Sequence, residues 1–285
     1  MKFTKMQGLG NDYIYINGFK EDIKNPAELS IRLSERHFGV GSDGIIIILP
    51  SDVADFRMRM FNADGSEGRM CGNGARCVAK YCHDKKLTDK TTFTLETLGG
   101  IKTLSCFLEN GVTKTVSVDM GRAEFRAAEI PVLLDCDEVI SKPLSTPVGE
   151  YTVTCVSMGN PHCVIFTECS PSELELDRIG PHFENHEAFP ERVNTEFIRQ
   201  LDESTLEMRV WERGSGETLA CGTGACAAVA AAVRNGLCQK NQEICVRLLG
   251  GELYITCSED YSITMRGPAE FSYEGEIEQI GRAHV

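Results

Sequence analysis

The stretch FNADGSEGRMCGNGARCVAKY, residues 61–81, places a cysteine, Cys71, among glycines at the expected start of a helix. The stretch WERGSGETLACGTGACAAVAAAV, residues 211–233, repeats this arrangement around Cys221, 150 residues further along the chain. Both cysteines come directly before a run of helix-forming residues. Two such motifs in one chain indicate a fold built from two similar halves, each with a cysteine at the start of its central helix.

Further matches at similar spacing, in the same order along the chain, support this duplication. LGNDYI at 9–14 falls near MGNPHC at 158–163, so that Asn11 matches Asn160. MGRAEF at 120–125 likewise resembles MRGPAEF at 265–271. Several matches in the same order are stronger evidence than any one of them, because glycine and asparagine recur by chance in turns. We therefore expect two pseudo-symmetric domains, residues 1–120 with a returning segment 268–285, and residues 121–267.

The rest of the chain is dominated by short, β-branched stretches bounded by Gly, Pro, Asn or Asp. They include GIIIIL, TTFTLET, KTVSVDM, YTVTCV, HCVIFT, TEFIRQL, TLEMRVW, EICVRLL, LYITC and YSITMR. Many short strands separated by turns are typical of antiparallel sheets and barrels. Only four helices are expected, at 26–37, 74–85, 172–186 and 224–235. The predicted fold class is α+β.

Composition limits the function classes. The chain has 285 residues, of which 42% are hydrophobic, and a formal net charge of −13. A negative charge of this size repels phosphate backbones and anionic lipids, so neither nucleic acid nor a membrane is an expected partner. The first residues lack the apolar stretch of a signal peptide, and the run IIIIL at 45–49 is far too short to span a bilayer. We expect a cytoplasmic protein.

Thirteen cysteines in a reducing compartment are expected to be free thiols. Most are interpreted as packing residues, because free cysteine behaves as a small hydrophobic side chain. This group contains Cys77, Cys106, Cys155, Cys163, Cys226 and Cys257. The sequence contains no C-x-x-C pair, and His182 and His186 lack a third ligand, so no metal site is expected.

Cys71 and Cys221 are different because of where they lie. The first N–H groups of a helix have no internal partner and the helix dipole is positive there, which predicts a lowered thiol pKa. The neighbouring glycines allow backbone N–H groups to approach an anion, so a substrate carboxylate is expected at the same helix start.

Twofold symmetry would direct both motifs at one cleft. Inverting a carbon centre requires proton removal on one face and proton delivery on the other, which an ionised thiol and a protonated thiol can perform. Nothing in the sequence indicates a pyridoxal site. The residues therefore predict a racemase or epimerase that needs no cofactor.

The motifs GLGNDY, FNADGSEGRMCGNGARC, GNPHCV, RVNTEF, WERGSGETLACGTGA and GPAEFSYEGEI are long and ordered, and the chain resembles the diaminopimelate epimerase family over essentially its full length. The resemblance implies interconversion of LL- and meso-2,6-diaminoheptanedioate in lysine and peptidoglycan precursor biosynthesis, without metal or cofactor. It implies two mixed β-barrel-like domains, each around a central helix, and a homodimer. It assigns Cys71 and Cys221 as the acid/base pair, His162 and Glu212 as neighbours that tune their pKa values, and Tyr273 as a dimer contact. The implied substrate contacts are Asn11, Asn62, Gly72, Asn73, Asn160, Asn194, Glu212, Arg213, Gly222 and Thr223.

One position departs from the family. Many members have glutamine where GSDGII has Gly44, so a side-chain contact to the distal end of the substrate is absent or replaced here. Asn11, Asn160 and Asn194 also have an alternative interpretation as turn residues, and Glu212 with Arg213 as a solvated ion pair.

Two other functions stay open at this level. Proline racemases and hydroxyproline epimerases share the two-cysteine design, but they resemble MCGHG where this chain has MCGNG, and they lack the WERGSGE segment. A thiol redox sensor, or a thiol-based binding protein, would use Cys71 and Cys221 as a regulatory disulfide but leaves both glycine-rich helix starts without a role.

Overall fold

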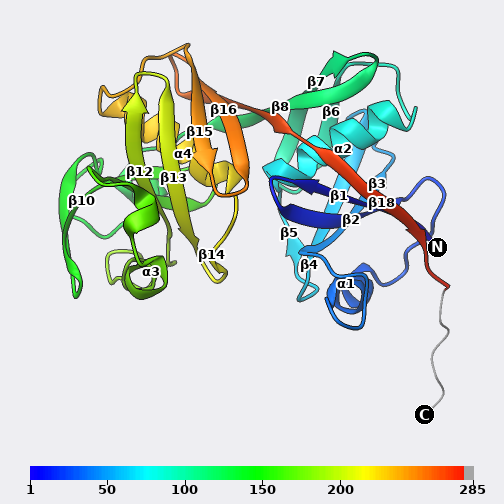
Figure 1. Cartoon of the computed structure of the whole chain (residues 1–285), viewed down its shortest axis with the longest axis horizontal. Helices are drawn as coiled ribbons and strands as arrows, with labels where there is room; N and C mark the ends of the chain where they lie inside the picture. Colours follow the sequence, from blue (N-terminus) through cyan, green and yellow to red (C-terminus); the bar gives the residue numbers. More distant parts are fainter. Residues whose placement is uncertain (279–285) are drawn as a thin grey trace. The chain divides into compact units, whose positions relative to one another are not determined.

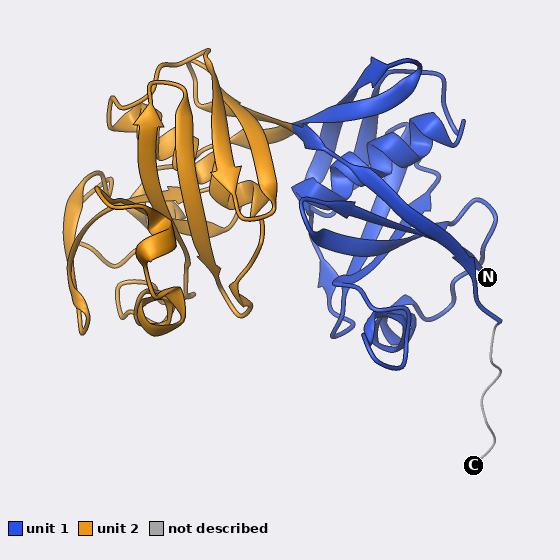
Figure 2. Cartoon of the chain, in the orientation of Figure 1, with its two compact units in different colours: residues 1–118, 267–285 blue, residues 119–266 orange. Residues whose placement is uncertain are grey.

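The structure is a computed structural model that describes residues 1–278. The chain divides into two compact units, one made of residues 1–118 with the segment from 267 onward, and one made of residues 119–266 (Figure 2). The chain passes from the first unit into the second along strand β8 (Val112–Arg122) and returns through strand β17 (Ser262–Pro268). Each unit combines strands with a few helices, which confirms the predicted α+β class.

Unit 1 contains two helices and most of the N-terminal strands (Figure 1). Besides β8, its elements are β1 (Lys2–Gly8), β2 (Asn11–Asn17), α1 (Pro26–Ser34), β3 (Gly44–Leu49), β4 (Phe56–Asn62), β5 (Glu67–Gly68), α2 (Gly72–Asp84), β6 (Thr92–Thr97), β7 (Gly100–Glu109) and β18 (Glu270–Glu276).

Unit 2 repeats much of this order. Besides β17, its elements are η1 (Ala127–Glu129), β9 (Lys142–Thr146), β10 (Gly149–Ser157), β11 (Pro161–Phe166), η2 (Pro171–Glu173), α3 (Leu176–Glu184), β12 (Asn194–Asp202), β13 (Thr205–Glu212), β14 (Gly216–Glu217), α4 (Gly222–Arg234), β15 (Glu243–Leu248) and β16 (Gly251–Cys257).

Helices α2 and α4 are the buried centres of their units. Almost every residue of each is buried, and α2 packs on β1, β2 and β7 while α4 packs on β10, β11, β12 and β16. A helix that is covered on all sides needs small or apolar residues around its whole circumference, and the sequence ACAAVAAAV of α4 provides them. Both helices begin two residues earlier than predicted, because Cys71 and Cys221 themselves act as N-caps.

The other two helices are shorter than predicted. Helix α1 ends at Ser34, because the chain turns back so that the N–H groups of Val40 and Gly41 both donate to the carbonyl of Leu33. The predicted helix 172–186 is interrupted at Leu174, which has extended backbone, and becomes the 3₁₀ turn η2 followed by α3.

The same strand pairing occurs in both units. β2 runs parallel to β3 with Tyr13 opposite Gly44, and β11 runs parallel to β12 with His162 opposite Asn194. Parallel neighbours bring their N-terminal ends to one edge of the sheet. In each unit this edge therefore carries the matching asparagine, Asn11 as the first residue of β2 and Asn160 directly before β11.

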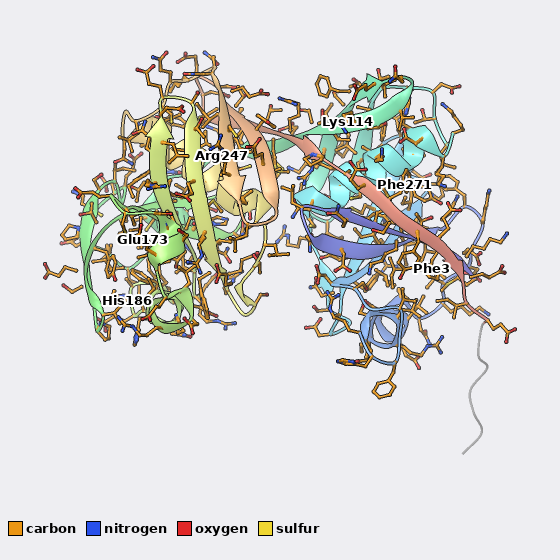
Figure 3. All side chains as sticks on the ribbon, viewed as in Figure 1. Phe3, Lys114, Glu173, His186, Arg247 and Phe271 are labelled. Carbon is orange, nitrogen blue, oxygen red and sulfur yellow. The ribbon has the colours of Figure 1, made fainter. Side chains whose placement is uncertain are left out.

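Each unit has its own apolar core. In unit 1 the core includes Ile14, Ile16 and Ile45, and the Phe3 ring of β1 lies over Gly275 of β18, where an added Cβ would come within 2.4 Å of the ring (Figure 3). In unit 2 a separate cluster gathers around Phe183 and Phe197, whose ring centroids are 5.6 Å apart. Among residues 1–278, no helix is long and apolar enough to cross a membrane.

Candidate active site

In unit 1, Cys71 caps helix α2. Its backbone is extended, its Sγ accepts the N–H of Gly74 at 3.3 Å, and its thiol donates to Oδ1 of Asn11 at 3.3 Å. Close packing explains the glycine at position 74, since a Cβ on Gly74 would come within 2.6 Å of the Ile46 side chain. Gly72 and Asn73 follow in the first turn, both buried. The helix start predicted from the sequence is therefore present.

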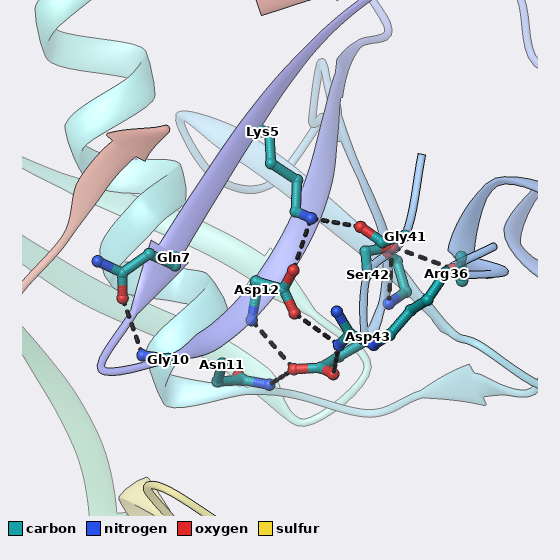
Figure 4. A network of polar contacts seen from close by, with 11 residues as sticks. Lys5, Gln7, Gly10, Asn11, Asp12, Arg36, Gly41, Ser42 and Asp43 are labelled. Carbon is teal, nitrogen blue, oxygen red and sulfur yellow. Dashed lines mark hydrogen bonds and ion pairs between the residues drawn. The ribbon is translucent and has the colours of Figure 1, made fainter. Parts of the chain in front are cut away.

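Asn11 is held by a network of charged residues (Figure 4). Its Nδ2 donates to Oδ2 of Asp43 at 2.7 Å, and the same oxygen accepts the backbone N–H of Asp12 at 3.0 Å. Arg36 donates to both Asp12 and Asp43, and Lys5 pairs with Asp12 at 2.5 Å. Burial opposes ionisation of Asp12, but Lys5 and Arg36 outweigh it and hold its pKa below the usual value.

Asn62 lies at the end of β4 in the same unit. Its Nδ2 donates to Ser66 at 3.0 Å, and the next residue, Ala63, donates its N–H to the carbonyl of Asp43. The Asn62 turn is thereby tied to the loop that holds Asn11.

In unit 2, Cys221 caps helix α4 in the same way. The N–H of Gly224 donates to its Sγ at 3.3 Å, the Thr223 hydroxyl lies 3.5 Å from that sulfur, and Gly222 begins the helix. The Cys221 residue is only 5% exposed, whereas Cys71 is partly exposed.

A chain of polar groups, fully buried at His162 and Glu196, leads toward Cys221. Nδ1 of His162 lies 2.7 Å from Oε1 of Glu196, and its Nε2 lies 3.1 Å from Oδ1 of Asn160. Nδ2 of Asn160 in turn donates to the Thr223 hydroxyl at 3.4 Å. The side chains of His162 and Glu196 have no solvent exposure. This chain reaches the thiol through Thr223.

The remaining predicted residues of unit 2 meet at the ends of β12 and β13. Oδ1 of Asn194 accepts the backbone N–H of Arg213 at 2.9 Å, and the Arg213 guanidinium donates to the carbonyl of Glu191 at 2.8 Å. The Glu212 carboxylate accepts a hydrogen bond from Thr218. Glu212 and Arg213 do not pair with each other in these contacts, so the interpretation as an ordinary solvated pair is wrong.

The pKa values around Cys221 correct one expectation. Burial, followed by the Glu212 and Glu196 carboxylates, raises the pKa of Cys221 well above its usual value, against the opposing hydrogen bonds from Thr223 and Gly224. The predicted lowering is wrong for this cysteine, because loss of solvent around the sulfur outweighs the helix N-terminus. Burial likewise raises the pKa of Glu212.

The other cysteines behave as predicted. All thirteen are free thiols. Cys77 and Cys226 are fully buried, and burial raises the pKa of Cys77 to about 11. His182 and His186 lie at the end of α3 and just beyond it, and His186 contacts the carbonyl of Ser145. Tyr273 is half-exposed on β18.

Sequence reasoning missed Asp43 and Glu196. Both lie inside the motifs GSDGII and RVNTEF. Asp43 accepts a hydrogen bond from the predicted residue Asn11, and Glu196 contacts the predicted residue His162. For Glu196 a signal existed, since a lone acid between Thr195 and Phe197 on an otherwise buried stretch of strand is rarely left there without a partner.

The chain is similar to known proteins over nearly its whole length. The sequence profile described as Diaminopimelate epimerase matches residues 3–126 and 154–272. The chain is 54% identical to a diaminopimelate epimerase of Methanococcus maripaludis over 98% of this chain and 100% of that protein. It is 50% identical to one from Acetivibrio thermocellus, over 98% of this chain and 99% of that one.

Solved structures with the same fold are more distant in sequence. A probable proline racemase from Agrobacterium radiobacter superimposes with a TM-score of 0.69 at 14% identity, covering 98% of this chain and 93% of that one. A PhzF-family phenazine biosynthesis protein from Bacillus anthracis also gives 0.69, at 18% identity, over 98% and 99%. These similarities concern the fold alone. The family profile and the near-full-length relatives show that the chain belongs to the diaminopimelate epimerase family.

Proposed function

We propose that the chain is a cofactor-independent epimerase that interconverts LL- and meso-2,6-diaminoheptanedioate, with Cys71 and Cys221 as the acid/base pair. The observation that carries the proposal is the duplicated N-cap cysteine, with a backbone N–H from the first turn donating to each sulfur. Near-full-length relatives named diaminopimelate epimerase support the substrate.

The reaction needs one thiolate and one thiol. The thiolate removes the α-proton, the electron pair of the broken C–H bond passes into an enediolate with the adjacent carboxylate, and the other thiol protonates the opposite face of that carbon. When the product leaves, the protonation states of the two sulfurs are exchanged. The enzyme can then convert the opposite isomer directly, or it exchanges protons with water before it converts the same isomer again.

The surroundings of Cys221 suit the acid of the first step. Its burial and the carboxylates of Glu212 and Glu196 favour the thiol. Once that proton has been delivered, the N–H of Gly224 and the Thr223 hydroxyl stabilise the resulting thiolate. We infer that Cys71 begins as the base when the substrate proton faces it.

The backbone at the two helix starts provides the carboxylate sites. Gly72 with Asn73, and Gly222 with Thr223, lie in the first turns of α2 and α4, where backbone N–H groups are not used within the helix. The polar side chains proposed to contact the rest of the substrate are Asn11, Asn62, Asn160, Asn194, Glu212 and Arg213.

Isotope transfer tests the function directly. In deuterium oxide the LL isomer should give meso product that carries deuterium at the inverted carbon, while recovered starting isomer stays protiated at early times. Optical rotation should fall to zero for the fraction that becomes meso. Equal early deuterium in both isomers would contradict two separate bases.

Alanine variants test the residues. Cys71→Ala and Cys221→Ala should each abolish epimerisation, since one face loses its only proton carrier. L-Proline and trans-4-hydroxy-L-proline serve as control substrates, and inversion of either would favour a proline racemase instead. A redox sensor would show no epimerisation of any substrate under reducing conditions.

We further infer that each compact unit is one domain, with functional boundaries at residues 1–120 plus 268–285 and 121–267; residues 279–285 lie outside the described part of the chain. We also infer a cytoplasmic homodimer. The half-exposed Tyr273 on β18 supports the dimer, because its ring packs on Phe3 at a centroid distance of 6.2 Å and the residue still stays 48% exposed in this chain.

A further inference from the structure

Asn11 and Asn160 occupy matching places in the two units, but different acids hold them. Asn11 is bonded directly to Asp43, whereas Asn160 is reached from Glu196 through His162. The position in unit 1 that matches Glu196 is Ile46, since Ile46 lies near Gly74 in the same way as Glu196 lies near Gly224. Asp43 and Glu196 therefore do not occupy matching positions, and the duplication alone does not explain why each asparagine has an acidic partner.

In unit 1 the charge decides which way the amide points. A carboxylate can only accept hydrogen bonds, so the Asn11 atom that lies 2.7 Å from Asp43 must be the donor Nδ2. The oxygen Oδ1 then faces Cys71 and accepts from its thiol. Asp43 is itself held by Arg36 and by the backbone N–H of Asp12. The Asn11 amide is thus fixed with its oxygen toward the sulfur.

In unit 2 the imidazole of His162 lies between the acid and the asparagine, and it orients the Asn160 amide. One proton lies between His162 Nδ1 and Glu196, because the two atoms are 2.7 Å apart in a site without solvent. Nε2 carries a second proton in two forms of this pair, a neutral ring beside a protonated acid or an imidazolium beside a carboxylate, and in both forms it donates to Oδ1 of Asn160. The Nδ2 group of Asn160 is then directed to Thr223.

We propose that Asp43 and Glu196 are positioning residues that fix the Asn11 and Asn160 amides in opposite senses, so that a carbonyl oxygen faces Cys71 and an N–H group is directed to Thr223 beside Cys221. The proposal rests on the assignment of the two cysteines as the acid/base pair. Neither acid touches the reacting atoms, and each acts through the asparagine it orients.

The opposite senses match the two roles in proton transfer. An oxygen acceptor at Cys71 favours the thiol that forms when this sulfur takes a proton. At Cys221, the Asn160 N–H donates to the Thr223 oxygen, so the hydroxyl proton of Thr223 is available to the sulfur 3.5 Å away. This second hydrogen bond favours the thiolate that forms when Cys221 gives up its proton. Both amides therefore stabilise the states that the first transfer produces.

The first experiment removes the carboxylate at Asn11. Asp43→Ala should lower kcat/KM about 10-fold or more, the effect of losing one hydrogen bond to a charged group. Asp43→Asn, which keeps a carbonyl oxygen for Asn11, should recover part of this loss. Asp55→Ala is the matched control, because it removes another carboxylate of unit 1, one that pairs with Lys90; it should stay within about threefold of the wild type. Equal losses in Asp43→Ala and Asp55→Ala, or no loss in Asp43→Ala, would overturn the proposal.

The second experiment separates hydrogen bonding from charge at Glu196. Glu196→Leu should lower kcat/KM about 10-fold or more, and Glu196→Gln, whose amide can still bond His162 Nδ1, should restore most of the activity. Glu207→Leu, which removes a carboxylate on β13 that pairs with Arg199, controls for loss of an acid in the same unit. Failure of glutamine to restore activity contradicts the positioning role.

A measurement on the wild-type protein covers the case in which the leucine variant does not fold. Proton-detected ¹⁵N spectra of the histidine rings should show a proton on Nε2 of His162, assigned by comparison with a His162→Gln variant. An unprotonated Nε2 would refute the proposal even with full enzyme activity. Conversely, this proton would be present in a protein that failed to epimerise, so the two failures are distinguishable.

Discussion

Glu184, at the end of α3, anchors the segment that carries Glu212 and Arg213. Its Oε2 accepts the indole N–H of Trp211 at 2.7 Å, and its Oε1 accepts the backbone N–H of Gly214 at 2.8 Å. The side chain is only 9% exposed and also pairs with the largely exposed Arg192. One buried carboxylate therefore holds both ends of a four-residue segment from another element.

Glu184→Ala removes both anchors. Each bond to a charged acceptor contributes about 1.5–3 kcal/mol, so their loss predicts destabilisation of roughly 3–6 kcal/mol. The exposed pair with Arg192 adds at most about 1 kcal/mol. For a unit of this size 1 kcal/mol corresponds to about 2–4 °C, so the expected fall in Tm is on the order of 6–24 °C. Glu184→Gln keeps one acceptor oxygen and should lose about half as much.

The assay uses a signal already in the chain, since Trp211 is its one tryptophan. Thermal unfolding followed by circular dichroism gives the Tm, and the emission maximum of Trp211 reports whether the indole has lost its partner. Glu187→Ala, an exposed acid three residues further on, is the control and should leave both signals unchanged. A Glu184→Ala protein with a Tm within about 2 °C of the wild type and unchanged emission would refute the anchoring role.

Three further predictions test other features. Burial raises the pKa of Cys77 to about 11, so the folded state keeps a proton that the unfolded chain releases near pH 9. The free energy of unfolding should therefore fall as pH rises from about 9 to 11. Urea titrations over this pH range should show a shallower fall for Cys77→Ala than for the wild type. Gly44→Gln, which introduces the side chain common in the family, should destabilise unit 1 by about 1–3 kcal/mol, because an added Cβ would lie 2.1 Å from the carbonyl oxygen of Phe61; an unchanged Tm would show that the backbone adapts. Tyr273→Asp should give monomers if β18 forms the dimer contact, as measured by light scattering. A molar mass equal to that of the wild type would show that the dimer contact lies elsewhere.

The sequence alone determined the class of the fold and the place of both cysteines. Period-two patterns and turn residues predict strands, because alternate side chains of a strand face opposite sides whatever the rest of the chain does. The duplicated C-G-x-G-A motifs placed Cys71 and Cys221 at helix starts, which the structure confirms to within two residues. These features follow from local backbone chemistry, so no distant contact is needed to predict them.

Other features were decided only by tertiary structure. The predicted lowering of the Cys221 pKa failed because burial and two carboxylates from β12 and β13 outweigh the helix start, and neither is visible in the local sequence. Asp43 and Glu196 gain their roles in the same way. Asp43 lies 32 residues from Asn11 and Glu196 lies 34 residues from His162, and parallel strand pairing brings each pair together. A side chain's chemistry is fixed by its sequence, but its partners, its solvent and therefore its protonation state are fixed by the folded chain.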